Sequence, residues 1–405
     1  MIDRRTLLKG SAGLAVGSAL AGCSANAEDA LNVLLLEGAV PSVVLTSFQK
    51  QTDARVRFQT VAQVQVAFQT LQRWQQPKSL DALSRFMPWR RTDERADTAN
   101  TANLVSLGDY WLTEAIAQDL IEPLAIPSDE LAQLPTTWQQ FVKRDRTGQP
   151  SSEGEVWAAP YRVQPLMIVY RASQVARGSA ARKPPFSSWR DLLAPELRQS
   201  IALPEHPNLV MALLQKLQND RFNASYDPSS ISSSNQRAAQ LTDQVASQLR
   251  DAFNQLSSQV KTYDTSTALK ALINEDVRVV VAWSGDVAIA LKRYRDIKAV
   301  IPEEGTLLSA DLWVQPKGSG LSEAAKSWLS FCSQMGPATE LSAAGKGISP
   351  VFLSETAKLP DSIKASYFSM KALRNSEPLL PLSEPLQTAY LNLWQRLRTN
   401  ASSTS

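Results

Sequence analysis

The chain has 405 residues, 43% of them hydrophobic, which is enough to build two domains that each have a core. A formal net charge of +3 over this length argues against a protein that binds nucleic acid. The two cysteines, Cys23 and Cys332, and the single histidine, His206, are too few for a zinc, iron–sulfur or haem site. We therefore expect no metal and no other cofactor, and we interpret Cys332 as a buried hydrophobic residue and His206 as a turn residue.

Residues 1–22 have the features of a targeting segment rather than of a folded element. Arg4-Arg5 resembles a twin-arginine export signal, and the apolar stretch 13–21 is too short for a stable membrane anchor. The sequence 20–23, Leu-Ala-Gly-Cys, resembles a lipobox, which implies that Cys23 is lipidated and becomes the mature N-terminus. We therefore expect a lipid-anchored protein of the bacterial periplasm or cell envelope. Two alternatives remain open, namely Sec export and an ordinary signal peptide with an incidental cysteine.

The first half of the remaining chain alternates strand and helix patterns. Apolar and period-two runs predict strands, and longer runs with helical spacing predict helices. The predicted strands are 31–36, 56–61 and 104–111, and the predicted helices are 43–49, 62–75, 112–119 and 138–141. Residues 78–103 mix arginine with acidic residues, which favours a solvated loop. The opening strand–helix–strand unit indicates an α/β domain.

The second half continues the same alternation. Residues 156–162 lead into a predicted buried strand over 166–171, and further strands are predicted at 201–203 and 260–263. The predicted helices are 209–217, 237–256 and 268–273. Ser322 is expected to cap a helix that Gly336-Pro337 ends. Two further helices, over 362–373 and 386–397, close the chain.

Residues 276–316 carry the candidate site. A β-branched strand over 277–283 ends at Trp283, a Ser-Gly-Asp turn follows, and a helix begins near Val287. A strand at 297–301, a turn at 302–305 and a strand at 309–314 that contains Asp311 complete the stretch. Ligands of open α/β sheets bind at the carboxyl edge, so we expect Trp283 and Asp311 to face one cleft. The alternative is that Trp283 is a core residue and Asp311 a cap.

This order of elements, with Trp-Ser-Gly-Asp at 283–286, Pro-Glu-Glu-Gly at 302–305 and Asp-Leu-Trp-Val at 311–314, resembles bacterial periplasmic solute-binding proteins of the spermidine/putrescine class. The likeness extends from about residue 31 to about residue 353. It implies an α/β, two-lobed periplasmic-binding-protein fold of type II, in which each lobe is a mixed sheet flanked by helices. Lobe 1 would comprise 31–165 plus 308–350, and lobe 2 would comprise 166–307 plus 351–400.

The resemblance also implies site residues. It places a ligand-contacting aromatic at Tyr110 and the first of two amine-binding carboxylates at Glu205, whereas Asn208 stands where the second would be. With Trp283 and Asp311 these complete the expected ligand site. The alternatives are helix-start packing for Tyr110 and a solvated loop carboxylate for Glu205.

Other aromatic positions of that family are replaced here, by Leu36, Ala39, Ser309 and Ile348. Several lost contacts of about 1 kcal/mol each would weaken a polyamine binder by roughly two decades. The solute is therefore expected to be a polyamine or a related amine, with another small cation or an uncharged molecule left open.

The expected function is the substrate-binding lipoprotein of an ABC importer, with a permease and an ATPase as partners. One alternative is an envelope lipoprotein that has lost ligand binding and serves as a scaffold. An enzyme could use Glu205, Asp286 or Asp311 for acid–base chemistry. No nucleophile–base pair is recognisable in the sequence, so we expect no catalytic activity.

Overall fold

A computed structural model describes residues 30–76, 102–126, 128–175, 185–219, 222, 249–343, 346–354, 357–358, 360–361, 369–382 and 384–402. The leader with Cys23 lies outside these residues, as do nearly all of the loop predicted at 78–103 and large parts of the helices predicted at 237–256 and 362–373.

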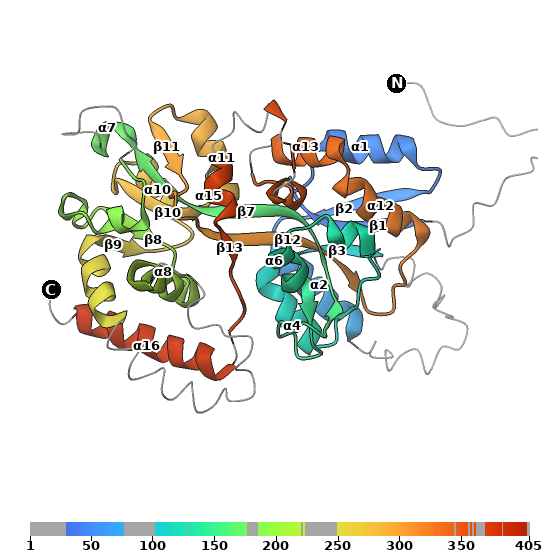
Figure 1. Ribbon diagram of the computed structural model, residues 1–405, viewed down its shortest axis with the longest axis horizontal. Helices are drawn as coiled ribbons and strands as arrows, with labels where there is room; N and C mark the ends of the chain where they lie inside the picture. Colours follow the sequence, from blue (N-terminus) through green and yellow to red (C-terminus); the bar gives the residue numbers. More distant parts are fainter. Residues whose placement is uncertain are drawn as a thin grey trace, which may run out of the picture.

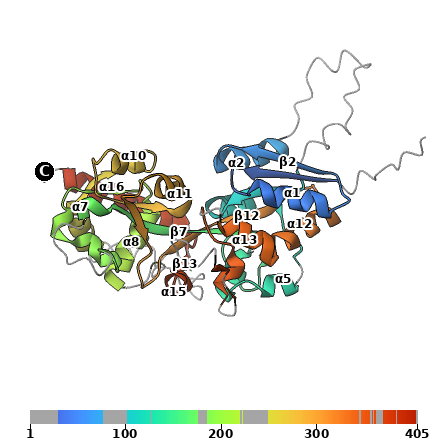
Figure 2. The ribbon, with the colours of Figure 1, turned by 90° about the horizontal axis from the view of Figure 1, so that it is seen from above.

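The structure has two α/β lobes, joined at the middle by two long strands (Figures 1 and 2). The strands are β1 (Leu31–Leu36), β2 (Val56–Val61), β3 (Leu104–Gly108), β4 (Ile121–Glu122), β5 (Lys143–Arg144), β6 (Glu155–Val156), β7 (Ala159–Arg171), β8 (Ile201–Leu203), β9 (Val260–Tyr263), β10 (Val279–Trp283), β11 (Ile297–Val300), β12 (Leu307–Pro316) and β13 (Glu377–Pro378). The α-helices are α1 (Ser42–Gln51), α2 (Val64–Gln75), α4 (Leu112–Ala117), α5 (Ser128–Ala132), α6 (Thr136–Val142), α7 (Ala172–Val175), α8 (Pro207–Asn219), α10 (Ala268–Ile273), α11 (Ser284–Arg293), α12 (Glu323–Ser333), α13 (Met335–Ala343), α15 (Met370–Arg374) and α16 (Glu384–Ser402). Short 3-10 helices are η3 (Asp109–Trp111), η4 (Trp189–Leu193), η5 (Pro195–Leu197) and η7 (Pro350–Leu353).

One mixed sheet runs through both lobes in the order β2-β1-β3-β12-β7-β10-β8-β9. The strands β1, β2 and β3 are parallel, and β12 joins β3 antiparallel. In the other lobe β8 and β10 are parallel and both β10 and β11 pair antiparallel with β7. The part of this sheet in each lobe is therefore mixed. The crossing strands β12 and β7 lie in the middle of the whole sheet.

Strand β7 changes partners halfway along its length. Pro165 still pairs with Leu308 of β12, whereas the next residue, Leu166, pairs with Trp283 of β10. The lobe boundary predicted between residues 165 and 166 lies at this change of partner, but pairing alone does not define the lobes, so the boundary stays a prediction. A crossover strand shared by two lobes can act as a hinge when the lobes move. The other lobe boundaries stay predictions as well.

The cores follow the strand pattern. In β1 the side chains of Leu31, Val33 and Leu35 enter a core formed with α1 and α12, and Leu34 enters a second core on the opposite face. Both faces of this parallel strand are thus covered, which explains the apolar run over residues 33–36. A third core lies in the other lobe, between β8, β10, α8 and α16.

Helix α12 agrees with its prediction at the start. The Ser322 hydroxyl accepts a hydrogen bond from the backbone N–H of Ala325 at 3.2 Å, and Cys332 is buried at 4% exposure. The predicted stop at Gly336-Pro337 is wrong, because both residues lie in the first turn of α13. Proline is tolerated there, since the first helical N–H groups have no intrahelical acceptor.

Candidate functional site

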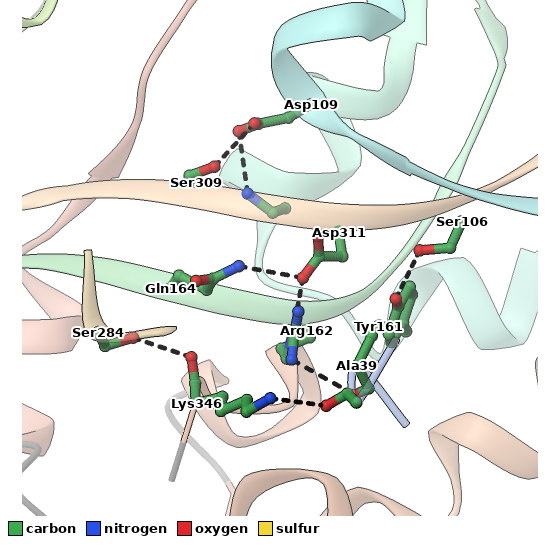
Figure 3. A network of polar contacts seen from close by, with 12 residues as sticks. Ala39, Ser106, Asp109, Tyr161, Arg162, Gln164, Ser284, Ser309, Asp311 and Lys346 are labelled. Carbon is green, nitrogen blue, oxygen red and sulfur yellow. Dashed lines mark hydrogen bonds and ion pairs between the residues drawn. The ribbon is translucent and has the colours of Figure 1, made fainter. Parts of the chain in front are cut away.

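Polar side chains gather where the two crossing strands pass from one lobe to the other. The pairs Asp311–Arg162 and Ser309–Gln164 face each other across β12 and β7. The Arg162 Nε donates to Asp311 Oδ2 at 2.6 Å, and the Gln164 Nε2 donates to the same oxygen at 3.1 Å (Figure 3). We call this region, together with the ends of β3 and β10 and the turn at residues 346–349, the junction.

The Asp311 carboxylate is already neutralised within the protein. Asp311 is 3% exposed and Arg162 is 4% exposed, so the two charges are removed from water together. Burial by itself would lower the pKa of Arg162, but the charge of Asp311, the neighbouring Tyr161 and the hydrogen bond to Asp311 together outweigh it, and the pKa is raised. The carboxylate expected to hold a solute amine therefore has a permanent internal partner.

The turn at residues 346–349 connects both lobes. Val163 of β7 and Ile348 exchange backbone hydrogen bonds of 2.8 Å in each direction. The Lys346 Nζ donates to the Gly38 carbonyl at 3.3 Å, and the Ser284 hydroxyl donates to the Lys346 carbonyl at 3.1 Å (Figure 3). The turn thus contacts the residues after β1 on one side and the start of α11 on the other.

Trp283 is the last residue of β10 and the N-cap residue of α11. Its side chain is half-buried and packs against the core of its own lobe. Two residues further, the backbone of Gly285 lies so close to β7 that an added Cβ would be 2.1 Å from the Gln164 Oε1. The start of α11 therefore lies against the junction. The turn predicted at 284–286 is wrong, because α11 begins at Ser284, directly after β10.

Tyr110 is an exposed aromatic residue, with 58% of its surface accessible. Its ring makes an edge-on contact with His206 of the other lobe, at 5.4 Å between centroids. The Nδ1 of His206 accepts from the Leu209 backbone N–H at 3.3 Å, and burial lowers the pKa of His206. The neighbouring Glu205 is exposed and accepts from Arg398 Nη1 at 2.7 Å. The second predicted carboxylate thus also has an arginine partner.

Asp109 is a junction residue that the sequence analysis missed. Its oxygens accept from the Ser309 hydroxyl at 2.8 Å and from the Ala310 backbone N–H at 2.9 Å, and the residue is half-buried (Figure 3). Burial raises the pKa of Asp109 to about 7, and the nearby charge of Asp311 adds to the rise. Within the described part of the chain Asp109 has no ion-pair partner. It is the junction carboxylate that remains available to a cation.

We expect the stability of the protein to depend on the titration of Asp109. A carboxyl group whose pKa is raised on folding favours the folded state below about pH 4, and this contribution is lost as the pH rises through about 7. Each unit of difference between the folded and unfolded pKa changes the free energy of unfolding by about 1.36 kcal/mol. Because Asp109 is partly exposed, solvent screening reduces the total, and we expect a change on the order of 2 kcal/mol. Asp109→Asn should remove this decline, which urea unfolding across that pH range measures. Equal pH dependence in both proteins would contradict the expectation.

The structure thus brings Tyr110, Trp283 and Asp311 to the junction and places Glu205 beside it. Sequence reasoning missed Arg162, Gln164, Asp109 and Lys346. The signal for Asp109 was its position directly before Tyr110, at the end of a strand. The partners of the two carboxylates gave no local signal, because Arg162 and Asp311 are 149 residues apart and Glu205 and Arg398 are 193 apart.

Comparison with known proteins identifies the family. The model of a bacterial extracellular solute-binding protein family matches residues 99–372, more than half of the chain. The chain therefore belongs to this family, which is one of binding proteins rather than enzymes. A search of curated proteins gave no match.

Solved structures share the fold. The spermidine/putrescine ABC transporter substrate-binding protein PotD of Streptococcus pneumoniae, in complex with calcium and HEPES, has a TM-score of 0.67 and 17% identity, over 92% of this chain and 99% of that one. A putative spermidine/putrescine ABC transporter protein from Listeria monocytogenes has a TM-score of 0.55 and 19% identity, over 91% and 99%. A Trichodesmium protein in complex with iron and citrate has a TM-score of 0.56 and 13% identity, over 91% and 99%. These likenesses confirm the predicted two-lobed α/β fold.

No helix among the described residues is both long and apolar enough to cross a membrane. The same residues contain no group of three or more His, Cys, Asp or Glu side chains placed to hold a metal ion.

Proposed function

We propose that this protein is the substrate-binding component of an ABC importer and that it captures a small amine between its two lobes. The family match and the two-lobed fold support a binding protein. The main support for an amine as the solute is the group formed by Tyr110, Asp109 and Trp283. This group combines exposed aromatic surface with a carboxylate that has no ion-pair partner among the described residues, where the lobes meet.

The chemistry of an amine fits this group. An ammonium over an aromatic face gains about 0.5–2 kcal/mol, and a hydrogen bond to a charged partner contributes about 1.5–3 kcal/mol. Asp311 and Glu205 would shape the site through Arg162 and Arg398 rather than bind the solute directly. The internal pairing of these two carboxylates therefore favours a related amine over a polyamine.

The solved structures with this fold name polyamine transport in some cases and iron in another. Iron is less well supported for this chain, because its described residues offer no cluster of metal ligands. A scaffold without a solute is also less well supported, since Tyr110 and Asp109 keep exposed and unpaired groups at the junction.

The location and the partners complete the proposal. Lipidation at Cys23 would hold the mature protein at the outer face of the cytoplasmic membrane, within the periplasm or cell envelope. There a permease and its ATPase would receive the solute. A lipid on an N-terminal Cys23, measured by mass spectrometry, supports this part, and a mature start elsewhere contradicts it.

A thermal-shift screen against diamines, polyamines, amino acids, sugars and oxyanions tests the binding function. A solute at about 100 times its Kd should stabilise the protein by about 2.7 kcal/mol. Tyr110→Ala should weaken amine binding by about 2- to 30-fold, the equivalent of one cation–π contact. Leu391→Ala, which removes an exposed apolar side chain on α16, is the matched control and should not change the affinity. A protein that no compound class stabilises would contradict the proposal.

A further inference from the structure

The charges of the junction leave one cation without an acidic partner. Asp311 is paired with Arg162, and Glu205 is paired with Arg398. Lys346 forms no ion pair with any described residue, and its recorded partner is the neutral Gly38 carbonyl at 3.3 Å. Glu37, next to Gly38, and Asp286, in the first turn of α11, are both exposed and neither is paired with Lys346.

Hydrogen bonds on several sides hold Lys346 and the turn that carries it. Its own carbonyl accepts from Ser284, and the following residues pair with β7 through Ile348. Gly38 has a φ of 67°, which favours glycine, and a Cβ there would be 2.8 Å from the Lys346 Nζ, so a larger residue would displace the ammonium. An ammonium has three donors, and the Gly38 carbonyl satisfies one of them.

A short path of contacts joins Lys346 to Asp109. Gly285 lies against both the Lys346 carbonyl and the Gln164 side chain. Gln164 faces Ser309 across the two crossing strands, and the Ser309 hydroxyl donates to Asp109. The unpaired cation and the unpaired carboxylate thus lie at two ends of one polar group of residues.

We propose that Lys346 binds an oxyanion group of the solute, so that the captured molecule is an amine that also carries an acid group. The inference rests on the proposed function, in which Asp109, Tyr110 and Trp283 receive the amine. A charge-assisted hydrogen bond to the ammonium is the strong form of such a contact. Two opposite charges at the junction select a zwitterion over a diamine, because the second ammonium of a diamine would meet Lys346.

Matched probes test this inference. Calorimetric titration of the purified protein compares straight-chain ω-amino carboxylic acids with diamines and with simple carboxylic acids of equal chain length. We expect at least one ω-amino acid to bind about tenfold or more tightly than the diamine of its length, a difference of about 1.4 kcal/mol. Lys346→Met should abolish that preference, and Lys346→Arg should keep most of it. Lys50→Met, on the exposed side of α1, is the control and should leave it unchanged.

The outcomes separate the two proposals. If diamines bind as well as or better than the ω-amino acids, or if Lys346→Met leaves the preference intact, the inference fails while the binding function stands. If no compound of any of the three series binds, the inference fails together with the amine-binding function. Because Lys346 is only half-buried, we expect both of its variants to fold. The melting temperature of each variant without solute checks this.

Discussion

Arg162→Met is expected to cost about 3–5 kcal/mol of unfolding free energy, because it leaves the Asp311 carboxylate buried without its counter-ion. The two side chains are each 5% exposed, and the Arg162 Nε lies 2.6 Å from the Asp311 Oδ2. Gln164 alone would then face the charge, and one neutral hydrogen bond does not offset the loss of hydration. Denaturant unfolding of the purified variant measures the cost.

Two further variants make this result specific. Adding Asp311→Leu to Arg162→Met should recover most of the loss, since a buried ion pair can be replaced by apolar groups at little cost. Arg146→Met removes the same side chain from a pair with Glu155 whose arginine is 85% exposed, and it should cost no more than about 1 kcal/mol. Equal costs for the Arg162 and Arg146 variants would show that burial of the pair has no energetic consequence.

Gly347→Ala should have the second large effect, because this glycine allows the turn at residues 346–349 to lie on β7. A Cβ at Gly347 would be 2.7 Å from the Val163 carbonyl oxygen and 2.8 Å from the Arg162 Cγ. Both neighbours are fixed, the first as strand backbone and the second within the buried ion pair. We expect a loss on the order of 2–3 kcal/mol and a weaker affinity for solute, measured by unfolding and by titration.

Gly336→Ala provides the comparison. A Cβ at this position meets no atom within 4 Å, and the residue lies in α13. Alanine in a helix is favoured over glycine by roughly 0.5–1 kcal/mol, so this variant should be as stable as the wild type or slightly more stable. A Gly347→Ala protein that behaves in the same way would show that the contact with β7 is not needed.

The regular elements could be predicted because their signals are local. The bounds of β1, β2, β8, β9 and α10 agree with the sequence prediction residue for residue. Alternation and apolar runs specify which faces are buried, and these patterns need no knowledge of distant residues. The misread Gly336-Pro337 pair shows the limit of this reasoning, since the same two residues are compatible with a helix end and with a helix start.

The site was harder to predict, because its chemistry depends on pairing between distant strands. The sequence indicates that Asp311 lies on a strand at the sheet centre, but only the register of β12 against β7 places Arg162 opposite it. A one-residue change of register would turn Arg162 to the other face. The same holds for Glu205, whose partner Arg398 comes from the last helix. Resemblance to a family identifies positions, and the charge state of each position still depends on these partners.

The central claim is that the lobes on either side of β7 and β12 close on a solute, and a distance measurement between them tests it most directly. Spin labels at Glu323→Cys on α12 and Lys270→Cys on α10 are exposed and lie in different lobes, whereas Cys332 is buried and should not react. With Cys23 replaced by serine, electron–electron double resonance is recorded without solute and with the tightest-binding amine. We predict a shorter and narrower distance distribution when solute is bound. An unchanged distribution under conditions where titration shows the site to be occupied would contradict the account.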